Sequence, residues 1–105
     1  MSKTNFLNSL TQLGKKIIPS GSHLWLYGSR ARGDAREDSD WDLLVLLDKD
    51  KRAWDDFDKY AYPFIELGLN ANTIVNPFIY TTTEWRNNQY SPFHYNVEED
   101  KVVLV

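Results

Sequence analysis

The spacing of apolar residues along the first half of the chain predicts one helix followed by two strands. From Phe6 to Ile17 the apolar positions recur at helical spacing, and Pro-Ser-Gly at residues 19–21 ends that helix. A short aromatic and aliphatic run at residues 23–27 precedes a glycine and predicts a strand. Residues 42–47 are apolar along most of their length, which favours a strand in the centre of a sheet.

Two further helices are predicted around and after these strands. Residues 29–36 have a composition compatible with a short helix, for which the Ser29 side chain is a suitable cap. Residues 52–67 carry apolar side chains at a period of 3.6 residues. Pro63 interrupts that pattern and is expected to kink the helix, and Gly68 is expected to end it.

The last third of the chain predicts two more strands and short helices between them. Residues 73–80 have the pattern of a strand, and Pro77 within it indicates an edge position or a bulge. Residues 84–88 suit a helical turn, and Ser91 before a proline is typical of a helix start. Residues 102–105 complete the sheet as a peripheral strand. The expected fold is therefore α/β (α+β), a small mixed sheet flanked by helices.

Size, composition and charge narrow the classes of protein that fit this pattern. The 105 residues have the size of one small domain, so residues 1–105 are expected to form a single unit. The N-terminus is polar, and no apolar run approaches the ~20 residues that cross a bilayer, so a cytoplasmic protein without membrane contact is expected. The chain has no cysteine, which excludes disulfides and thiolate chemistry. Its net charge of −3 argues against direct binding to nucleic acid.

Two aspartates at the start of the central strand are candidate metal ligands. Asp40 and Asp42 flank Trp41, and side chains at positions i and i+2 of a strand point to the same face, roughly 6.5 Å apart. Both carboxylates can therefore converge on Mg²⁺, which prefers oxygen ligands and shares them with phosphates and water. An Asp-x-Asp triplet on its own is also compatible with a plain polar strand entrance.

Gly28 and Ser29, at the exit of the preceding strand, form a candidate phosphate-binding turn. A glycine there permits close approach of the backbone, and amide N–H groups together with the serine hydroxyl can donate to a phosphate. A Gly-Ser pair alone is an ordinary turn, and the Walker A pattern is absent. Asp40 follows Ser29 by eleven residues, so neighbouring strands would bring turn and carboxylates together around a metal-bound triphosphate.

This combination resembles the nucleotidyltransferases of the polymerase-beta-like superfamily, which carry Gly-Ser, a short helix and then Asp-x-Asp on the next strand. The chain is most similar to the minimal nucleotidyltransferases (MNT proteins). Their pattern is Gly-Ser-x-Ala-x-Gly followed by Ser-Asp-x-Asp-Leu. The positions that match it are Gly28, Ser29, Ala31, Gly33, Ser39, Asp40, Asp42 and Leu43. The resemblance continues more loosely through the third predicted strand to the end of the chain.

The resemblance implies transfer of a nucleoside monophosphate from a triphosphate such as ATP to a hydroxyl group. Asp40 and Asp42 would be the catalytic carboxylates and would hold two Mg²⁺ ions. Gly28 and Ser29 would bind the β- and γ-phosphates. Small MNT proteins resemble antitoxins that act with a separate helical protein of the HEPN type and can adenylylate it, so a partner of that kind is expected.

The chain departs from the family pattern at the third carboxylate. The family places an acid on the strand after the long helix, and alignment of that strand puts Asn76 at its position. An amide can ligate a metal weakly through its oxygen but cannot accept a proton. Glu66 and Glu84 are the nearest candidates to replace it, although nothing in the sequence places them at the site.

The remaining polar residues allow two interpretations. Arg30 and Arg32 are candidate nucleotide-binding residues that could reach a triphosphate, but on a helix Arg32 and Arg36 would share a face and could equally pair with nearby acids as a solvated surface. His23 and His94 lack partner ligands at metal-binding spacing and are interpreted as structural.

Three functions remain open from the sequence. The first is an active nucleotidyltransferase, which the intact Gly-Ser and Asp-x-Asp motifs favour. The second is a catalytically degenerate nucleotide-binding module or antitoxin scaffold, which Asn76 favours. The third is an unrelated α/β domain with a coincidental motif. The sequence does not specify the base, the acceptor or the oligomeric state.

Overall fold

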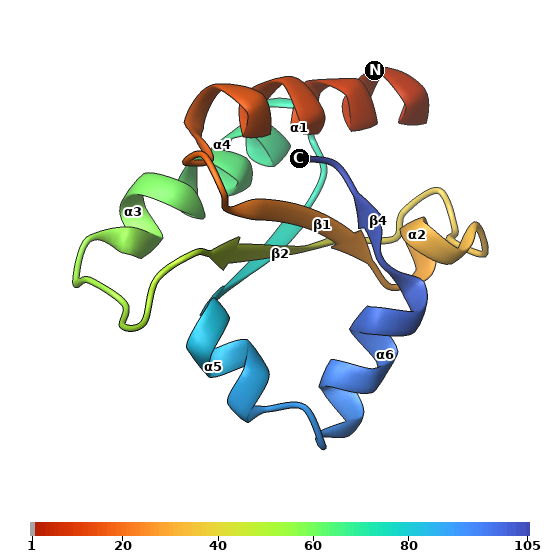
Figure 1. The fold of residues 1–105 in the computed structure, drawn as a ribbon. Coiled ribbons are helices and arrows are strands. Elements are labelled where there is room, and N and C mark those ends of the chain that lie inside the picture. Colours follow the sequence, from red (N-terminus) through yellow and green to blue (C-terminus); the bar gives the residue numbers. More distant parts are fainter. Residues whose placement is uncertain (1) are drawn as a thin grey trace.

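The computed structural model describes residues 2–105 (Figure 1). Its elements, in chain order, are α1 (Lys3–Ile17), β1 (His23–Tyr27), α2 (Ser29–Arg32), β2 (Trp41–Leu47), α3 (Asp56–Tyr60), α4 (Tyr62–Asn70), β3 (Val75–Thr81), α5 (Thr82–Asn87), α6 (Pro92–Asp100) and β4 (Val102–Val103). None of the helices within the described residues has the length and apolar character that a bilayer-spanning segment needs.

The four strands form one mixed sheet in the order β3-β2-β1-β4. β1 is antiparallel to both β2 and β4, whereas β2 and β3 are parallel. The predicted fold class is thereby confirmed, as are the interior position of β2 and the edge position of β3. Pro77 is tolerated in β3 because an edge strand leaves every second amide unpaired.

Helices cover both faces of the sheet, and α1 and α4 lie on the face opposite to α5 and α6 (Figure 1). Because side chains alternate along a strand, β2 divides between these two layers. Leu43 and Val45 belong to the core that also contains Phe64 of α4, whereas Leu44 packs with Trp85 of α5. Even-numbered residues of β2 therefore point toward α5 and α6, and this parity decides which face carries the candidate site.

Two predicted helices differ from those observed. The helix expected over residues 52–67 is instead α3 and α4, and Pro63 lies in the first turn of α4, where its missing N–H costs nothing. Gly68 does not end α4 but lies inside it, where a Cβ would approach the Val75 side chain to 2.7 Å. The helix expected to reach residue 36 stops at residue 32, because Gly33 adopts a left-handed conformation with φ of 84°.

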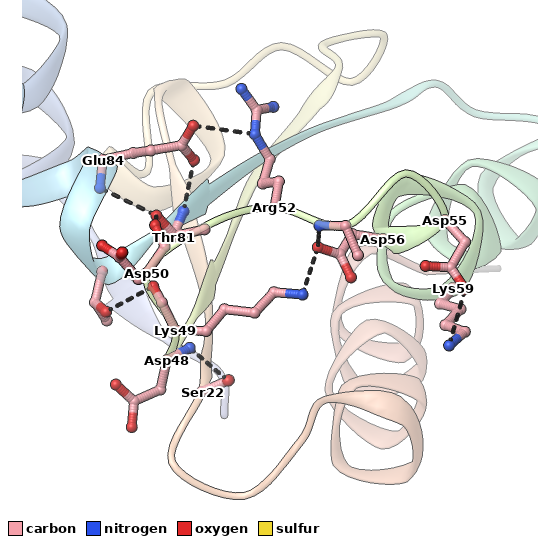
Figure 2. A network of polar contacts seen from close by, with 12 residues as sticks. Ser22, Asp48, Lys49, Asp50, Arg52, Asp55, Asp56, Lys59, Thr81 and Glu84 are labelled. Carbon is pink, nitrogen blue, oxygen red and sulfur yellow. Dashed lines mark hydrogen bonds and ion pairs between the residues drawn. The ribbon is translucent and has the colours of Figure 1, made fainter.

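A network of polar contacts fixes the loop between β2 and α3, at the end of the sheet where β2 and β3 terminate (Figure 2). Thr81 Oγ1 donates to the Asp50 carbonyl at 3.0 Å. The side chain of Thr81 also caps α5, and Glu84 completes the capping box by accepting from the Thr81 amide. Arg52 Nε donates to the same Glu84 carboxylate at 3.1 Å. The loop is consequently held against the start of α5 by side chains from both segments.

Asp56 is the buried carboxylate of this network, and its removal is expected to destabilise the fold. It accepts from the Lys49 ammonium and the Ala53 amide, both at 2.6 Å. Burial raises the pKa of Asp56, but these two donors outweigh burial and hold the pKa below its usual value. We expect Asp56→Ala to lower the free energy of unfolding by about 2–3 kcal/mol at neutral pH.

The pH dependence of this effect has a defined sign. A depressed carboxyl pKa contributes stability above the unfolded-state pKa and loses it as the pH falls through the folded-state pKa. Urea unfolding of wild type and Asp56→Ala should therefore differ most at neutral pH and progressively less toward about pH 3. Asp58→Ala, which removes an exposed carboxylate two residues away, is the matched control. An equal loss in both variants would contradict the role given to Asp56.

Candidate functional site

The structure brings Asp40, Asp42 and Asn76 together at one end of the sheet. Asp42 and Asn76 are direct neighbours in the parallel register of β2 and β3, so both side chains point toward the face that α5 and α6 cover. Asp40 precedes β2 by one residue, and Asn76 Nδ2 donates to Asp40 Oδ2 at 2.9 Å. An amide therefore lies beside both aspartates at the adjacent ends of β2 and β3.

The Gly28–Ser29 turn lies directly against these side chains. Tyr27 pairs with Asp42 in the antiparallel register, so the chain turns into α2 beside the aspartate. Gly28 has φ of 77°, and a Cβ at this position would lie 2.6 Å from Asp42 Oδ2. Only glycine allows the backbone both this conformation and this approach. Ser29 is the first residue of α2, and Gly28 occupies the cap position, so the expectation that Ser29 caps the helix is wrong.

The site holds negative charge that is partly withdrawn from water. Burial and the neighbouring Asp40 charge raise the pKa of Asp42, while the Asn76 amide and Arg32 oppose this shift. The pKa of Tyr27 is also raised, first by burial and then by the charge of Asp42 and the hydroxyl of Tyr80. Burial and the Asp40 charge both disfavour the charged form of Asp42, and a cation bound beside it would favour that form.

The donor set fits a hard divalent cation such as Mg²⁺. Asp40 and Asp42 offer carboxylate oxygens at one end of the sheet, and the absence of a side chain at Gly28 lets the Asp42 carboxylate lie against the backbone of the turn. Among residues 2–105, no cluster of three or more histidine, cysteine, aspartate or glutamate side chains could enclose an ion. Two carboxylates alone leave most ligand positions to phosphate oxygens and water, which is the usual arrangement for Mg²⁺.

Arg30 lies on the opposite side of the sheet from Asp42. Its guanidinium covers the Trp41 ring at 4.4 Å, and Trp41 belongs to the core beneath α1. Nε and Nη2 donate to the Ser39 carbonyl, and Nη2 also donates to the Glu37 carbonyl. Arg30 therefore shapes the segment that leads into β2, and it would have to leave these contacts to reach a triphosphate.

Arg32 forms ion pairs on the surface, as the second interpretation of this residue predicts. It contacts Asp34 at 3.2 Å and Asp100, at the end of α6, at 2.8 Å. Its charge nevertheless lowers the pKa of Asp42, so it lies within electrostatic reach of the site. Arg36 lies beyond the end of α2, so the expectation that Arg32 and Arg36 share a helix face is wrong.

Neither alternative acid stands at the site. Glu84 follows β3 and lies near Thr81, five residues along the strand from Asn76, which corresponds to roughly 16 Å. Glu66 belongs to α4, on the other face of the sheet (Figure 1). The two histidines have structural contacts: the His94 ring stacks on Trp85 at 4.3 Å, and His23 Nδ1 lies 3.2 Å from the Val105 carbonyl oxygen.

Aromatic residues beside the carboxylates are the part of the site that the sequence reasoning missed. Tyr27 and Phe78 share the face of Asp42 and Asn76, and both rings contact Phe93 of α6, at 5.6 and 5.9 Å between centroids. The alternation of side chains in residues 23–27 and 75–81 was the available signal, because it places these residues on one face once the register of the strands is known.

The fold and this arrangement of turn, carboxylates and strands define a nucleotidyltransferase domain. The sequence profile of the nucleotidyltransferase domain family matches residues 4–105, and the chain belongs to this family. No curated protein sequence matches the chain.

Two solved structures share the fold at low sequence identity. A chain from the crystal structure of a toxin–antitoxin with AMP-PNP superposes with a TM-score of 0.62 at 18% identity, covering 94% of this chain and 72% of the other. A protein from Sulfolobus solfataricus, assigned as a nucleotidyltransferase, gives a TM-score of 0.61 at 21% identity and covers 95% and 79%. At these sequence identities, both similarities establish a shared fold alone.

The close approach of Gly28 to Asp42 can be tested with a matched pair of glycines. Gly28 and Gly33 both have positive φ, but a Cβ at Gly33 meets nothing within 4 Å. Both alanine substitutions should cost about 1–3 kcal/mol of stability through backbone strain. Only Gly28→Ala should also displace Asp42 and weaken metal-dependent nucleotide binding, by at least about tenfold. Urea unfolding and calorimetric titration with Mg-ATP measure the two effects, and equal nucleotide affinities in both variants would contradict this geometry.

Proposed function

We propose that this domain binds a nucleoside triphosphate, with ATP as the first candidate, as its magnesium complex. We propose further that it transfers the nucleoside monophosphate to a hydroxyl group and releases pyrophosphate. The observation that carries the proposal is the contact between the Gly28 backbone and the Asp42 carboxylate, which joins a candidate phosphate turn to a candidate metal site. Membership of the nucleotidyltransferase family supports the same conclusion.

Each part of the site has a distinct role in this proposal. The backbone of Gly28 and the hydroxyl of Ser29 hold the β- and γ-phosphates. Asp40 and Asp42 would hold Mg²⁺, two ions in the family pattern, at the adjacent ends of β1 and β2. Such a cation would supply positive charge to offset the phosphates and the charge on the attacking and leaving oxygens. Asn76 fixes Asp40 through its hydrogen bond but cannot deprotonate the acceptor.

A protein is the acceptor that we favour, and a helical partner of the HEPN type is the first candidate. The similarity in fold to a chain of a toxin–antitoxin structure with AMP-PNP supports both nucleotide binding and a protein partner. The net charge of −3 argues against long nucleic acids as acceptors. A cytoplasmic location, where ATP is abundant, belongs to the same proposal. Transfer of labelled AMP to a co-expressed partner tests it directly.

A second candidate function is a nucleotide-binding antitoxin scaffold without catalysis. The amide of Asn76 favours this alternative, because no other described carboxylate stands beside Asp40 and Asp42. Loss of a general base typically reduces a rate by about 10²–10⁴-fold while leaving substrate binding in place. The two candidates therefore share the nucleotide site and differ only in transfer.

Replacement of Ser29 by alanine tests the phosphate turn without disturbing the fold. The Ser29 side chain does not cap α2, so its removal should leave thermal stability almost unchanged. The affinity for Mg-ATP should fall by about 0.5–3 kcal/mol, because one hydrogen bond to a phosphate is lost. Ser20→Ala, at an exposed position before β1, is the control and should bind like the wild type. Unchanged affinity of Ser29→Ala would refute the role of this hydroxyl.

A further inference from the structure

The order of the strands fixes the side from which an acceptor can reach the site, provided that the proposed function holds. β1, β2 and β3 lie side by side and carry Gly28–Ser29, Asp42 and Asn76 at their adjacent ends. In nucleotidyl transfer the attacking and the leaving oxygen stand roughly in line on opposite sides of the phosphorus. With the leaving pyrophosphate at Gly28–Ser29 and the metal at Asp42, the attacking hydroxyl comes from the side of β3.

The surface of β3 on that side is apolar and open. Phe78 follows Asn76 by two residues on the same face of the strand, and 52% of its surface is exposed although it contacts Phe93. β3 is an edge strand, so no further strand covers it. Phe78 therefore packs on Phe93 with part of its ring and leaves the rest open, two residues along the strand from Asn76.

Phe78 also forms one wall of a groove along this edge, which we call the β3 groove. Pro77 and Phe78 line one side, and Trp54 and Phe57 line the other, around a volume of about 480 Å³. Trp54 is 93% exposed and Phe57 46% exposed. With Tyr80, four large aromatic side chains line this open groove and form a surface of the kind that marks a contact site for another molecule.

The charges that border the β3 groove are neutralised within this chain. Arg52 pairs with Glu84 at 3.1 Å, and Asp56 pairs with Lys49 at 2.6 Å. The groove therefore offers no surplus positive charge to a polyanion and suits an uncharged apolar segment. The same pairs hold the loop that carries Trp54 against the rest of the domain (Figure 2). Pro77 lacks an N–H, which disfavours docking by addition of a β-strand.

We propose that the β3 groove receives the acceptor, and that the acceptor is an uncharged apolar segment of a partner protein that carries the hydroxyl group. In the balanced reaction, the hydroxyl oxygen of that segment forms a bond to the α-phosphorus of the triphosphate. The bond from the α-phosphorus to the oxygen bridging it to the β-phosphorus breaks, pyrophosphate leaves, and the hydroxyl proton passes to solvent or to the leaving group. Phe78 holds the acceptor segment, whereas Asp40 and Asp42 bind the nucleotide.

An NMR titration with a defined probe tests this assignment. The ¹⁵N-labelled protein is first saturated with Mg²⁺ and an ATP analogue whose α–β bridge is a methylene group, so that no transfer occurs. The blocked tripeptide acetyl-Leu-Tyr-Leu-amide is then added as the acceptor probe. We expect it to shift the amide signal of Phe78 and the indole signal of Trp54. Its affinity should fall about five- to tenfold in Phe78→Ala and in Trp54→Ala.

Two controls make the result decisive. Tyr90→Ala removes an aromatic side chain that is 91% exposed and does not line the groove, so it should bind the tripeptide like the wild type. Trp54→Ala removes an almost fully exposed side chain and keeps the test valid if Phe78→Ala perturbs folding. Preferential binding of a thymidine dinucleotide in the groove, or no shift of the Phe78 and Trp54 signals with the tripeptide, would each overturn the proposal. The amide signals of Gly28 and Ser29 report nucleotide binding separately, so failure of the proposed function would be visible by itself.

Discussion

Asn76→Asp is expected to raise the rate of nucleotidyl transfer by up to about 10²–10⁴-fold over a slow or inactive wild type. Asn76 stands beside Asp42 in the strand register and contacts Asp40, so an aspartate there would place a third carboxylate at the metal pair. A carboxylate can accept the proton of the attacking hydroxyl, which the amide cannot do. The assay is transfer of labelled AMP from ATP to the protein itself and to a co-purified helical partner.

The gain should depend on the intact metal site. It should require Mg²⁺ and disappear when Asp42 is also replaced by asparagine, because base and metal ligands act as one unit. Asn76→Ala, which removes the amide without adding a carboxylate, is the control and should show no gain. A wild type that already transfers rapidly, with no change in Asn76→Asp, would show that the proton acceptor lies elsewhere. Transfer by neither protein to any partner tested would favour the non-catalytic scaffold.

The double substitution Asp40→Asn/Asp42→Asn is expected to reduce metal-dependent affinity for a nucleoside triphosphate by about 100-fold or more. Amides are far weaker ligands for Mg²⁺ than carboxylates, so the metal bridge between protein and phosphates would be lost. Titration of both proteins with Mg-ATP in a calorimeter measures the effect. Asp38→Asn, which neutralises an exposed carboxylate outside the site, is the matched control and should leave the affinity unchanged.

The same substitutions should stabilise the protein in the absence of metal. Asp42 is partly buried next to Asp40, and both burial and this neighbour disfavour its charge. Its neutral replacement should therefore raise the midpoint of thermal unfolding in metal-free buffer. If the double variant instead unfolds at a lower temperature than the wild type in metal-free buffer, Asp40 and Asp42 serve the stability of the fold. A site that costs stability without its ligand is the pattern expected of a binding site.

Much of the fold was accessible from the sequence, because the strands carry unambiguous patterns. The apolar run of β2 and the proline of β3 predicted an interior and an edge strand, and both positions are confirmed. The helix expected over residues 52–67 was wrong, because apolar periodicity does not reveal where a helix begins. Burial of Asp56 with its Lys49 and Ala53 partners, and the first-turn position of Pro63, decide that boundary.

The arrangement of the candidate site was predictable where it depended on local spacing and not where it depended on tertiary contacts. The spacing of the Gly28–Ser29 turn and the two aspartates indicated that they would meet, and strand pairing places Gly28 against Asp42. The guanidinium of Arg30 instead covers Trp41, a contact that no sequence pattern marks.

The exposure of Phe78 could not be predicted from the sequence either. The residue belongs to an aromatic-rich strand and has the pattern of a core residue. Its exposure depends on which edge of the sheet is left uncovered, and this is decided by the strand order and by the placement of α5 and α6.

The most direct test of the central claim is calorimetric titration of ATP into the wild-type protein, once with Mg²⁺ and once with a chelator. Phosphates bound at Gly28–Ser29 would lie next to the two carboxylates, so without a cation the carboxylates repel the nucleotide. We expect saturable binding with Mg²⁺ and no measurable binding in the chelator. Equal affinity under both conditions would contradict the assignment of Asp40 and Asp42 as metal ligands and of this end of the sheet as the nucleotide site.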